Sequence, residues 1–139
     1  MATFSQTALY RDQHGRLREH AAKMLAAPGA AEHRTLLAQL AGQVKMHLKV
    51  EDDSLYPRLI AHSDAAVRDK ARQLQTSMGA LAGTFQAFYE KWIKAGAIAA
   101  DEAAYVREMR AVIDALAKRM DMEDKELYDL ADRALHAAA

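Results

Sequence analysis

One phrase occurs twice in this chain, first as His47-Leu-Lys-Val-Glu51-Asp-Asp-Ser-Leu55-Tyr56-Pro57 and again as Arg119-Met-Asp-Met-Glu123-Asp-Lys-Glu-Leu127-Tyr128-Asp129. Glu, Asp, Leu and Tyr recur in register, whereas the histidine of the first copy is an arginine in the second. Residues four apart lie on the same face of a helix, so His47 and Glu51 form a pair that is suited to a transition metal. Arginine stays protonated and has no lone pair to donate, so Arg119 cannot replace the imidazole as a ligand.

The composition favours one helical domain over residues 1–139. Nineteen Lys and Arg residues balance nineteen Asp and Glu residues, which gives no basic surface for nucleic acid or membrane. The chain has no cysteine, which excludes disulfides and thiolate metal sites. No signal peptide is evident, and no apolar run approaches the roughly 20 residues of a membrane helix. We therefore expect a cytoplasmic domain.

Alanine, leucine, methionine and charged residues dominate the sequence, which is typical of helices. Ser63 and Asp101 are plausible N-caps, and Gly29 and Gly96 stand where helices usually end. These breaks leave four predicted helical segments, at about 5–27, 31–62, 64–95 and 101–136. Short connections between long helices predict an all-α, antiparallel up-down four-helix bundle.

Ionisable residues interrupt the apolar stripes that should face the core of this bundle. They are His14 in the first segment, His47 and Glu51 in the second, and Arg119 and Glu123 in the fourth. Burying such a group without a partner costs on the order of several kcal/mol or more, so each of them needs a partner. Their positions along the helices predict that they share one layer near the middle of the bundle.

Two further features of the repeated phrase bear on its structure. Pro57 falls inside the second segment, so we expect a kink or a break just beyond the polar layer. Tyr56 and Tyr128 recur in the two copies and are expected to cap the ends of their helices.

Three fragments of the sequence resemble the hemerythrin-like (HHE cation-binding) domain family, and the similarity covers nearly the whole chain. The fragments are Asp12-Gln-His14-Gly-Arg-Leu-Arg-Glu, His47-x-x-x-Glu51-Asp-x-x-Leu-Tyr-Pro and Glu123-Asp-x-x-Leu-Tyr. The resemblance implies a four-helix bundle whose core holds a non-heme di-iron centre, usually with five histidines and two bridging carboxylates. It also implies oxygen binding, sensing of oxygen, nitric oxide or iron, or repair of iron centres.

The residues that match the family's ligands are His14, His47, Glu51 and Glu123. The third segment, which supplies one or two histidines in the family, has none here, and Arg119 stands in place of the histidine of the fourth. The residues of the third segment at the layer are instead Leu74, Ser77, Met78 and Leu81. A five-histidine di-iron centre therefore cannot be assembled from this chain.

Two interpretations of the remaining set stay open. In the first, His14, His47, Glu51 and Glu123 bind one metal ion, mononuclear or partly occupied, and the set suits iron(II), manganese or zinc. In the second, no metal binds, and Arg119 forms charge-assisted hydrogen bonds with Glu51 and Glu123 in a core network that His14 or His47 joins.

The functional expectation is a non-enzymatic, hemerythrin-like protein with a degenerate metal site and a sensing or regulatory role. The alternatives are a metal-free interaction module and an iron protein that binds oxygen or nitric oxide at an unusual site. We expect no catalytic residue, because the chain has no phosphate loop, no nucleophile elbow and no Glu-x-x-His motif at a core position. The expected partners are a small diatomic ligand or another protein, in a monomer or a dimer.

Overall fold

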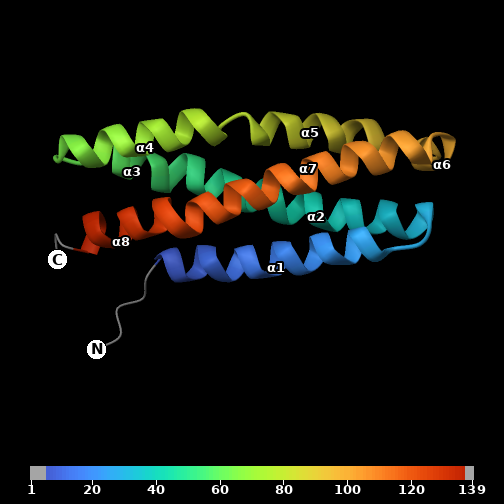
Figure 1. Ribbon diagram of the computed structural model, residues 1–139, viewed down its shortest axis with the longest axis horizontal. Helices are drawn as coiled ribbons and strands as arrows, with labels where there is room; N and C mark the ends of the chain where they lie inside the picture. Colours follow the sequence, from blue (N-terminus) through green and yellow to red (C-terminus); the bar gives the residue numbers. More distant parts are fainter. Residues whose placement is uncertain (1–5, 137–139) are drawn as a thin grey trace.

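The structure of this protein, a computed structural model, describes residues 6–136 as an antiparallel bundle of helices (Figure 1). We call each line of helices that runs the length of the bundle a column. The first column is α1 (Gln6–Ala26), and the second runs without interruption through α2 (Ala30–Val50), η1 (Glu51–Leu55) and α3 (Tyr56–Ile60). The third consists of α4 (Ala65–Met78) and α5 (Leu81–Trp92), and the short α6 (Ala97–Ala100) follows it. The fourth comprises α7 (Glu102–Met122), η2 (Glu123–Leu127) and α8 (Tyr128–His136).

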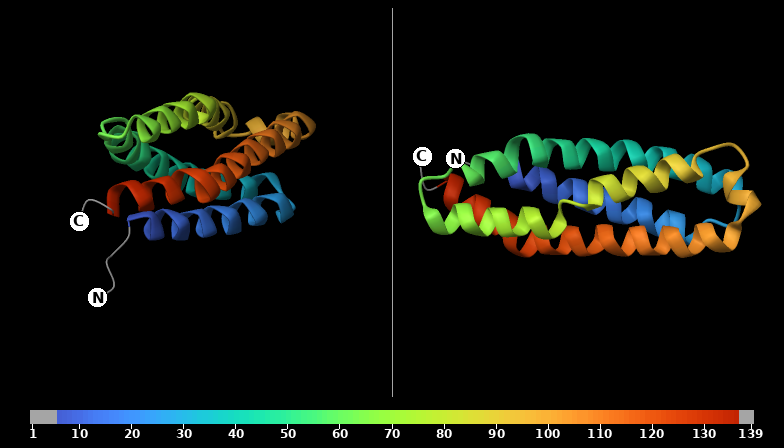
Figure 2. Two further views of the ribbon diagram at one scale, coloured as in Figure 1. Left: turned by 60° about the vertical axis from the view of Figure 1, so that its left-hand side comes forward. Right: turned by 90° about the horizontal axis from the view of Figure 1, so that it is seen from above.

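Neighbouring columns pack side by side along their length (Figure 2). The first column contacts α2 as well as α7 and α8, while α5 contacts α2 and α7. This arrangement confirms the prediction of an all-α antiparallel bundle. No helix in the described part of the chain combines the length and apolar character needed to cross a membrane.

The ends of the helices agree only in part with the predicted caps. Asp101 caps α7, since its Oδ1 accepts a hydrogen bond from the Ala104 N–H at 3.1 Å. The prediction for Ser63 is wrong, because Asp64 caps α4 by accepting from the Ala66 N–H at 2.9 Å. Gly96 adopts φ +79°, a left-handed conformation that favours glycine, where the chain turns between α5 and α6.

A polar layer divides the apolar core into two clusters. One cluster lies toward α5 and α6 and includes Leu37, Phe85, Trp92 and Leu116, and the other lies toward α3 and α4 and includes Leu59, Ala71 and Leu127. In every column, the buried apolar residues on the two sides of the predicted layer belong to different clusters. The flanking pairs are Tyr10 and Leu17, Leu48 and Leu55, Leu74 and Leu81, and Met120 and Leu127.

The third column breaks at this level, whereas the sequence predicts one helix over 64–95. Gly79 and Ala80 separate α4 from α5, and the Gly79 N–H donates to the Gln75 carbonyl oxygen at 2.7 Å. A Cβ added to Gly79 would lie 2.7 Å from that same oxygen, so a side chain would force the backbone to shift. The break leaves the carbonyl of Met78 accessible to a side chain from another column.

The second and fourth columns each contain one π-helical turn at the same level. The Tyr56 N–H bonds to the Glu51 carbonyl, and the Tyr128 N–H bonds to the Glu123 carbonyl, five residues back in each case. The irregularity therefore begins at Glu51, one turn earlier than the break predicted beyond the layer. Pro57 does not cause it, because the second copy has Asp129 at that position and forms the same turn. Such turns occur often at functional sites.

Candidate metal centre

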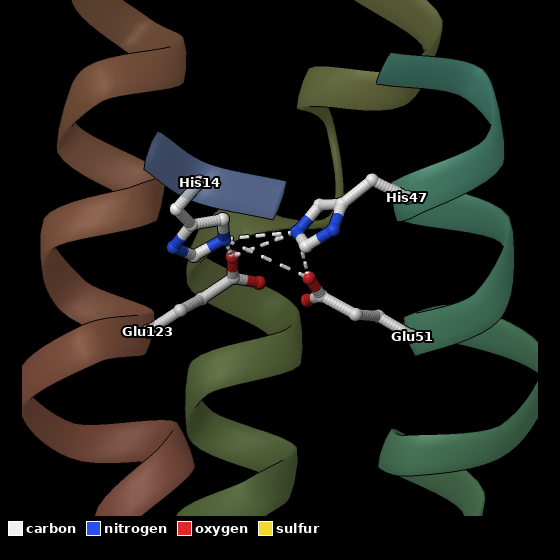
Figure 3. Close-up of side chains that lie close together, drawn as sticks. All are labelled: His14, His47, Glu51 and Glu123. Carbon is white, nitrogen blue, oxygen red and sulfur yellow. Dashed lines mark hydrogen bonds and ion pairs between the residues drawn. The ribbon is translucent and has the colours of Figure 1, made fainter. Parts of the chain in front are cut away.

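Four side chains from three columns meet in the polar layer (Figure 3). His14 comes from α1, His47 from α2, and Glu51 and Glu123 are the first residues of the two π turns. Each side chain is at most 2% exposed. One ligand atom from each residue lies within 4.8 Å of the others. The structure thus brings together the four residues that the sequence singled out as metal ligands.

One oxygen of each carboxylate faces the two imidazoles, as Figure 3 shows. The Nε2 atoms of His14 and His47 lie 2.9 Å apart. His14 Nε2 is 3.1 Å from Glu123 Oε1, and His47 Nε2 contacts Glu51 Oε1 directly. The hydroxyl of Tyr128 also reaches this place, at 2.9 Å from His14 Nε2. We call His14, His47 and Tyr128 the histidine face of the glutamate pair.

The outer nitrogens of both imidazoles are occupied by hydrogen bonds. His14 Nδ1 donates to Asp124 Oδ1 at 2.8 Å, and His47 Nδ1 donates to Gln13 Oε1 at 2.6 Å. Arg18 in turn donates to the other oxygen of Asp124 at 2.7 Å. Carboxylate and amide oxygens only accept, so each Nδ1 carries a proton, and each Nε2 points inward, where an uncharged imidazole presents a lone pair. Histidines that bind metals are commonly oriented in this way.

Arg119 lies against the opposite oxygens of the two glutamates. Its Nε donates to Glu123 Oε2 at 3.0 Å, and its Nη2 lies 3.5 Å from Glu51 Oε2. Nη1 donates to the Met78 carbonyl that the helix break exposes, at 3.2 Å, and Nη2 also lies 3.5 Å from Asp52 Oδ1. Arg119, Asp52 and the Met78 carbonyl form what we call the arginine face. The guanidinium therefore leaves the space between the imidazoles open.

Burial and mutual contact shift the pKa values of these groups. Burial, together with the neighbouring Glu123, raises the pKa of Glu51. Burial opposes ionisation of Glu123 as well, but hydrogen bonds with Glu51, His14 and His47 and the charge of Arg119 lower its pKa. Burial disfavours the charged form of His47, yet its hydrogen bonds with Glu123 and Glu51 prevail and raise its pKa to about 9.

The histidine face fits one metal ion. Atoms that bind an ion at about 2.0–2.2 Å lie roughly 3–4 Å from one another. His14 Nε2 lies 2.9 Å from His47 Nε2 and 3.1 Å from Glu123 Oε1, close to such separations, whereas His47 Nε2 and Glu51 Oε1 are in closer contact and would move apart around an ion. Two lone pairs facing each other at 2.9 Å, on His14 and His47, repel unless a proton or a cation lies between them. Glu123 Oε1 is buried beside these nitrogens, at 3.1 Å from His14 Nε2. Two imidazoles and two carboxylates suit iron(II), manganese or zinc.

Sequence reasoning missed three residues of this site. Tyr128 does not cap a helix end, because its hydroxyl donates to Glu51 Oε1 at 2.9 Å inside the layer. Gln13 and Asp124 orient the imidazoles, although neither stands on an apolar stripe. The recurrence of tyrosine five residues after glutamate, at Tyr56 and Tyr128, was the available signal. Ser77, which was expected at the layer, is exposed.

Comparison with known proteins agrees with this geometry. The family model described as "Hemerythrin HHE cation binding domain" matches residues 5–131, a range that contains all four inward ligand atoms. No curated protein and no solved structure gives a significant match. The match spans nearly the whole chain and includes every residue of the histidine face. The chain therefore belongs to the hemerythrin HHE cation-binding domain family.

Proposed function

We propose that this protein binds a single divalent transition-metal ion, with iron(II) the first candidate, through His14, His47, Glu51 and Glu123. Its role is non-enzymatic, and it senses or regulates through a small diatomic ligand such as oxygen or nitric oxide. Family membership supports cation binding, and non-heme iron is the metal that the family implies. The ion would supply an electrophilic centre to which such a ligand could bind.

The opposed imidazoles are the observation that carries this proposal. Both Nδ1 atoms are engaged with acceptors, and both Nε2 atoms converge at 2.9 Å beside two carboxylate oxygens. These nitrogens and oxygens bring electron pairs close together in the protein core, which costs free energy unless a cation lies among them. The four side chains supply fewer donors than the six of an octahedral ion, so positions remain for an added ligand.

Arg119 restricts this site to one ion. Its guanidinium stays charged, because Glu123 and Glu51 raise its pKa further despite the opposing effect of burial. It occupies the Oε2 atoms of both glutamates, which would otherwise be free to bind a second cation. A second metal ion on that side would face a permanent positive charge, so we infer a mononuclear centre.

The metal-free network remains the second candidate, and one observation favours it. The raised pKa of His47 means that the metal-free protein keeps this imidazole protonated at neutral pH. Protonated His47 and Arg119 then carry two positive charges, which balance the two negative charges of Glu51 and Glu123. In that case the bundle would act through its surface, as an interaction module.

Metal analysis after reconstitution separates these candidates. The protein is stripped with a chelator, reloaded anaerobically with iron(II), freed of excess iron and measured by mass spectrometry for iron per chain. We expect one iron per chain in the wild type and in Ser77→Ala, whose side chain is exposed. His47→Gln should lose it. Iron no higher than background in the wild type would overturn the proposal, and two irons per chain would overturn the mononuclear site.

A further inference from the structure

The hydroxyl of Tyr128 lies among the proposed metal ligands. It is 2.9 Å from Glu51 Oε1, 2.9 Å from His14 Nε2 and 3.5 Å from His47 Nε2. The side chain is fully buried.

When both imidazoles are uncharged, as metal binding requires, the number of protons at this place is too small for a network of hydrogen bonds alone. The phenol carries a single proton, which it donates to Glu51 Oε1. Its oxygen lone pairs then face His14 Nε2, whose own lone pair points inward because Asp124 accepts the Nδ1 proton. Two lone pairs at 2.9 Å repel, so the phenol oxygen and His14 Nε2 are placed as two ligands of one cation would be.

The backbone and neighbouring rings hold Tyr128 in this position. The π turn of η2 places it one turn beyond Glu123, because its N–H bonds to the carbonyl five residues back. Its ring stacks on Tyr10, with centroids 5.6 Å apart, and the guanidinium carbon of Arg11 lies 5.4 Å from the ring centroid. The hydroxyl is thereby fixed toward the histidine face rather than toward solvent.

Tyr56 is the counterpart of Tyr128 in the first copy of the phrase, and it differs in this respect. It is 1% exposed, yet within the described chain its hydroxyl has no hydrogen-bond partner. It lies close enough to Glu123 and Arg119 for their charges to affect its pKa, which burial mainly raises. Tyr56 therefore provides a matched control of the same residue type, burial and backbone setting.

We propose that the phenolate oxygen of Tyr128 is a fifth ligand of the metal and that it favours iron(III) at this site. When ferricyanide, a one-electron oxidant, takes one electron from bound iron(II) and becomes ferrocyanide, the Tyr128 hydroxyl would release its proton to solvent and its oxygen would bond to the iron(III). An anionic oxygen is a hard ligand and suits the more highly charged ion. The inference rests on the proposed metal site.

The charges of the layer support this pairing of oxidation with proton loss. Iron(II) with two carboxylates and a neutral phenol has no net charge, and iron(III) with two carboxylates and a phenolate has none either. Arg119 adds the same positive charge in both states. The buried site thus keeps its charge when the iron is oxidised, which avoids the cost of a new unpaired charge in the core.

Visible spectroscopy of the iron-loaded protein tests this inference. Wild type, Tyr128→Phe and Tyr56→Phe are loaded anaerobically with iron(II), oxidised with ferricyanide and desalted, and the iron content of each is measured. Iron(III) phenolates absorb visible light by charge transfer from oxygen to iron. We expect this band in the wild type and in Tyr56→Phe, and its complete loss in Tyr128→Phe at equal iron content.

The outcomes distinguish this inference from the proposed function. Suppose that all three proteins bind iron. If the wild type then lacks the band, or if Tyr128→Phe retains it, the tyrosine ligand is overturned and the metal site stands. Absence of bound iron from the wild type would overturn both. Should Tyr128→Phe fail to fold, resonance Raman spectra of wild type grown with ring-deuterated tyrosine must show isotope-shifted phenolate vibrations; unshifted spectra would reject the inference.

Discussion

The two faces of the Glu51–Glu123 pair present opposite kinds of partner to the same carboxylates. On the histidine face, the Nε2 atoms of two imidazoles and the hydroxyl of a tyrosine lie against the Oε1 atoms. On the arginine face, a guanidinium directs N–H groups toward the Oε2 atoms. The second face has a permanent cation built into the chain, whereas the first presents imidazole nitrogens that could bind one. A single difference between the copies of one phrase, histidine or arginine, gives the two faces these different properties.

Each face combines parts of both copies. The histidine face takes His47 from the first copy and Tyr128 from the second, and it gains His14 from α1. The arginine face takes Arg119 from the second copy and Asp52 from the first. Because the two copies lie on different columns that meet in the core, neither copy alone constitutes a site.

Replacing arginine by histidine should make the two faces alike. In Arg119→His, an uncharged imidazole would replace the guanidinium beside the Oε2 atoms, so we expect a second iron to bind and the content to rise from one per chain toward two. Iron per chain after reloading, measured as a function of free iron, checks this. Arg119→Leu removes the charge without adding a ligand and should stay at one. One iron per chain in both variants would mean that the arginine is not what keeps the second ion out.

The two glutamates should differ in how much they stabilise the metal-free protein. Glu123→Ala removes the only direct hydrogen bond between Arg119 and the glutamate pair, and loss of a buried partner costs about 3–5 kcal/mol. Glu51→Ala should cost less, because Glu51 lies 3.5 Å from Arg119 and its raised pKa shows that its charge is held at a penalty.

Urea unfolding of chelator-treated protein measures both losses. Asp52→Ala, on the same face with a side chain that is 42% exposed, is the control and should cost under about 1 kcal/mol. A loss for Glu123→Ala as small as that of the control would show that Arg119 does not depend on Glu123.

The smallest expected effect concerns pH and His47. Its pKa is raised in the folded protein to about 9 from 6.5, so its contribution to stability is complete below the lower value and is lost as pH rises through the higher one. At about 1.4 kcal/mol per pKa unit, the metal-free protein should lose up to about 3 kcal/mol over this interval.

Unfolding free energies between about pH 7 and pH 9.5 check the sign and size of this effect. His47→Gln should flatten the profile, while His62→Gln serves as a histidine control away from the layer. A wild-type profile that rises with pH over this interval would contradict protonation of His47 in the metal-free state.

Much of the fold followed from local patterns. Apolar residues at helical spacing, with Gly29, Gly96 and Asp101 at the ends, predict the columns and their antiparallel order, because these signals act within one helix. Ser63 was the wrong cap because Asp64, its neighbour, could form the same hydrogen bond. The break at Gly79 was missed because the stripe of Leu74 and Leu81 continues across it.

The residues of the site, too, could be predicted from local patterns only in part. His14, His47, Glu51 and Glu123 could be identified from the sequence, because an ionisable residue on an apolar stripe needs a partner. Tyr128 could not be placed in this way, because a π turn adds one residue to the helix and moves the side chains beyond it off the expected periodicity.

Residue type and helical spacing are local properties, so they were enough to predict that the helices would bury two glutamates, with a histidine on one phrase and an arginine on the other. Which oxygen of each carboxylate meets which partner could be seen only in the folded protein. That choice depends on how the columns are placed around the π turns and the break at Gly79. It leaves Arg119 beside one face of the glutamates and the imidazoles, with Tyr128, beside the other.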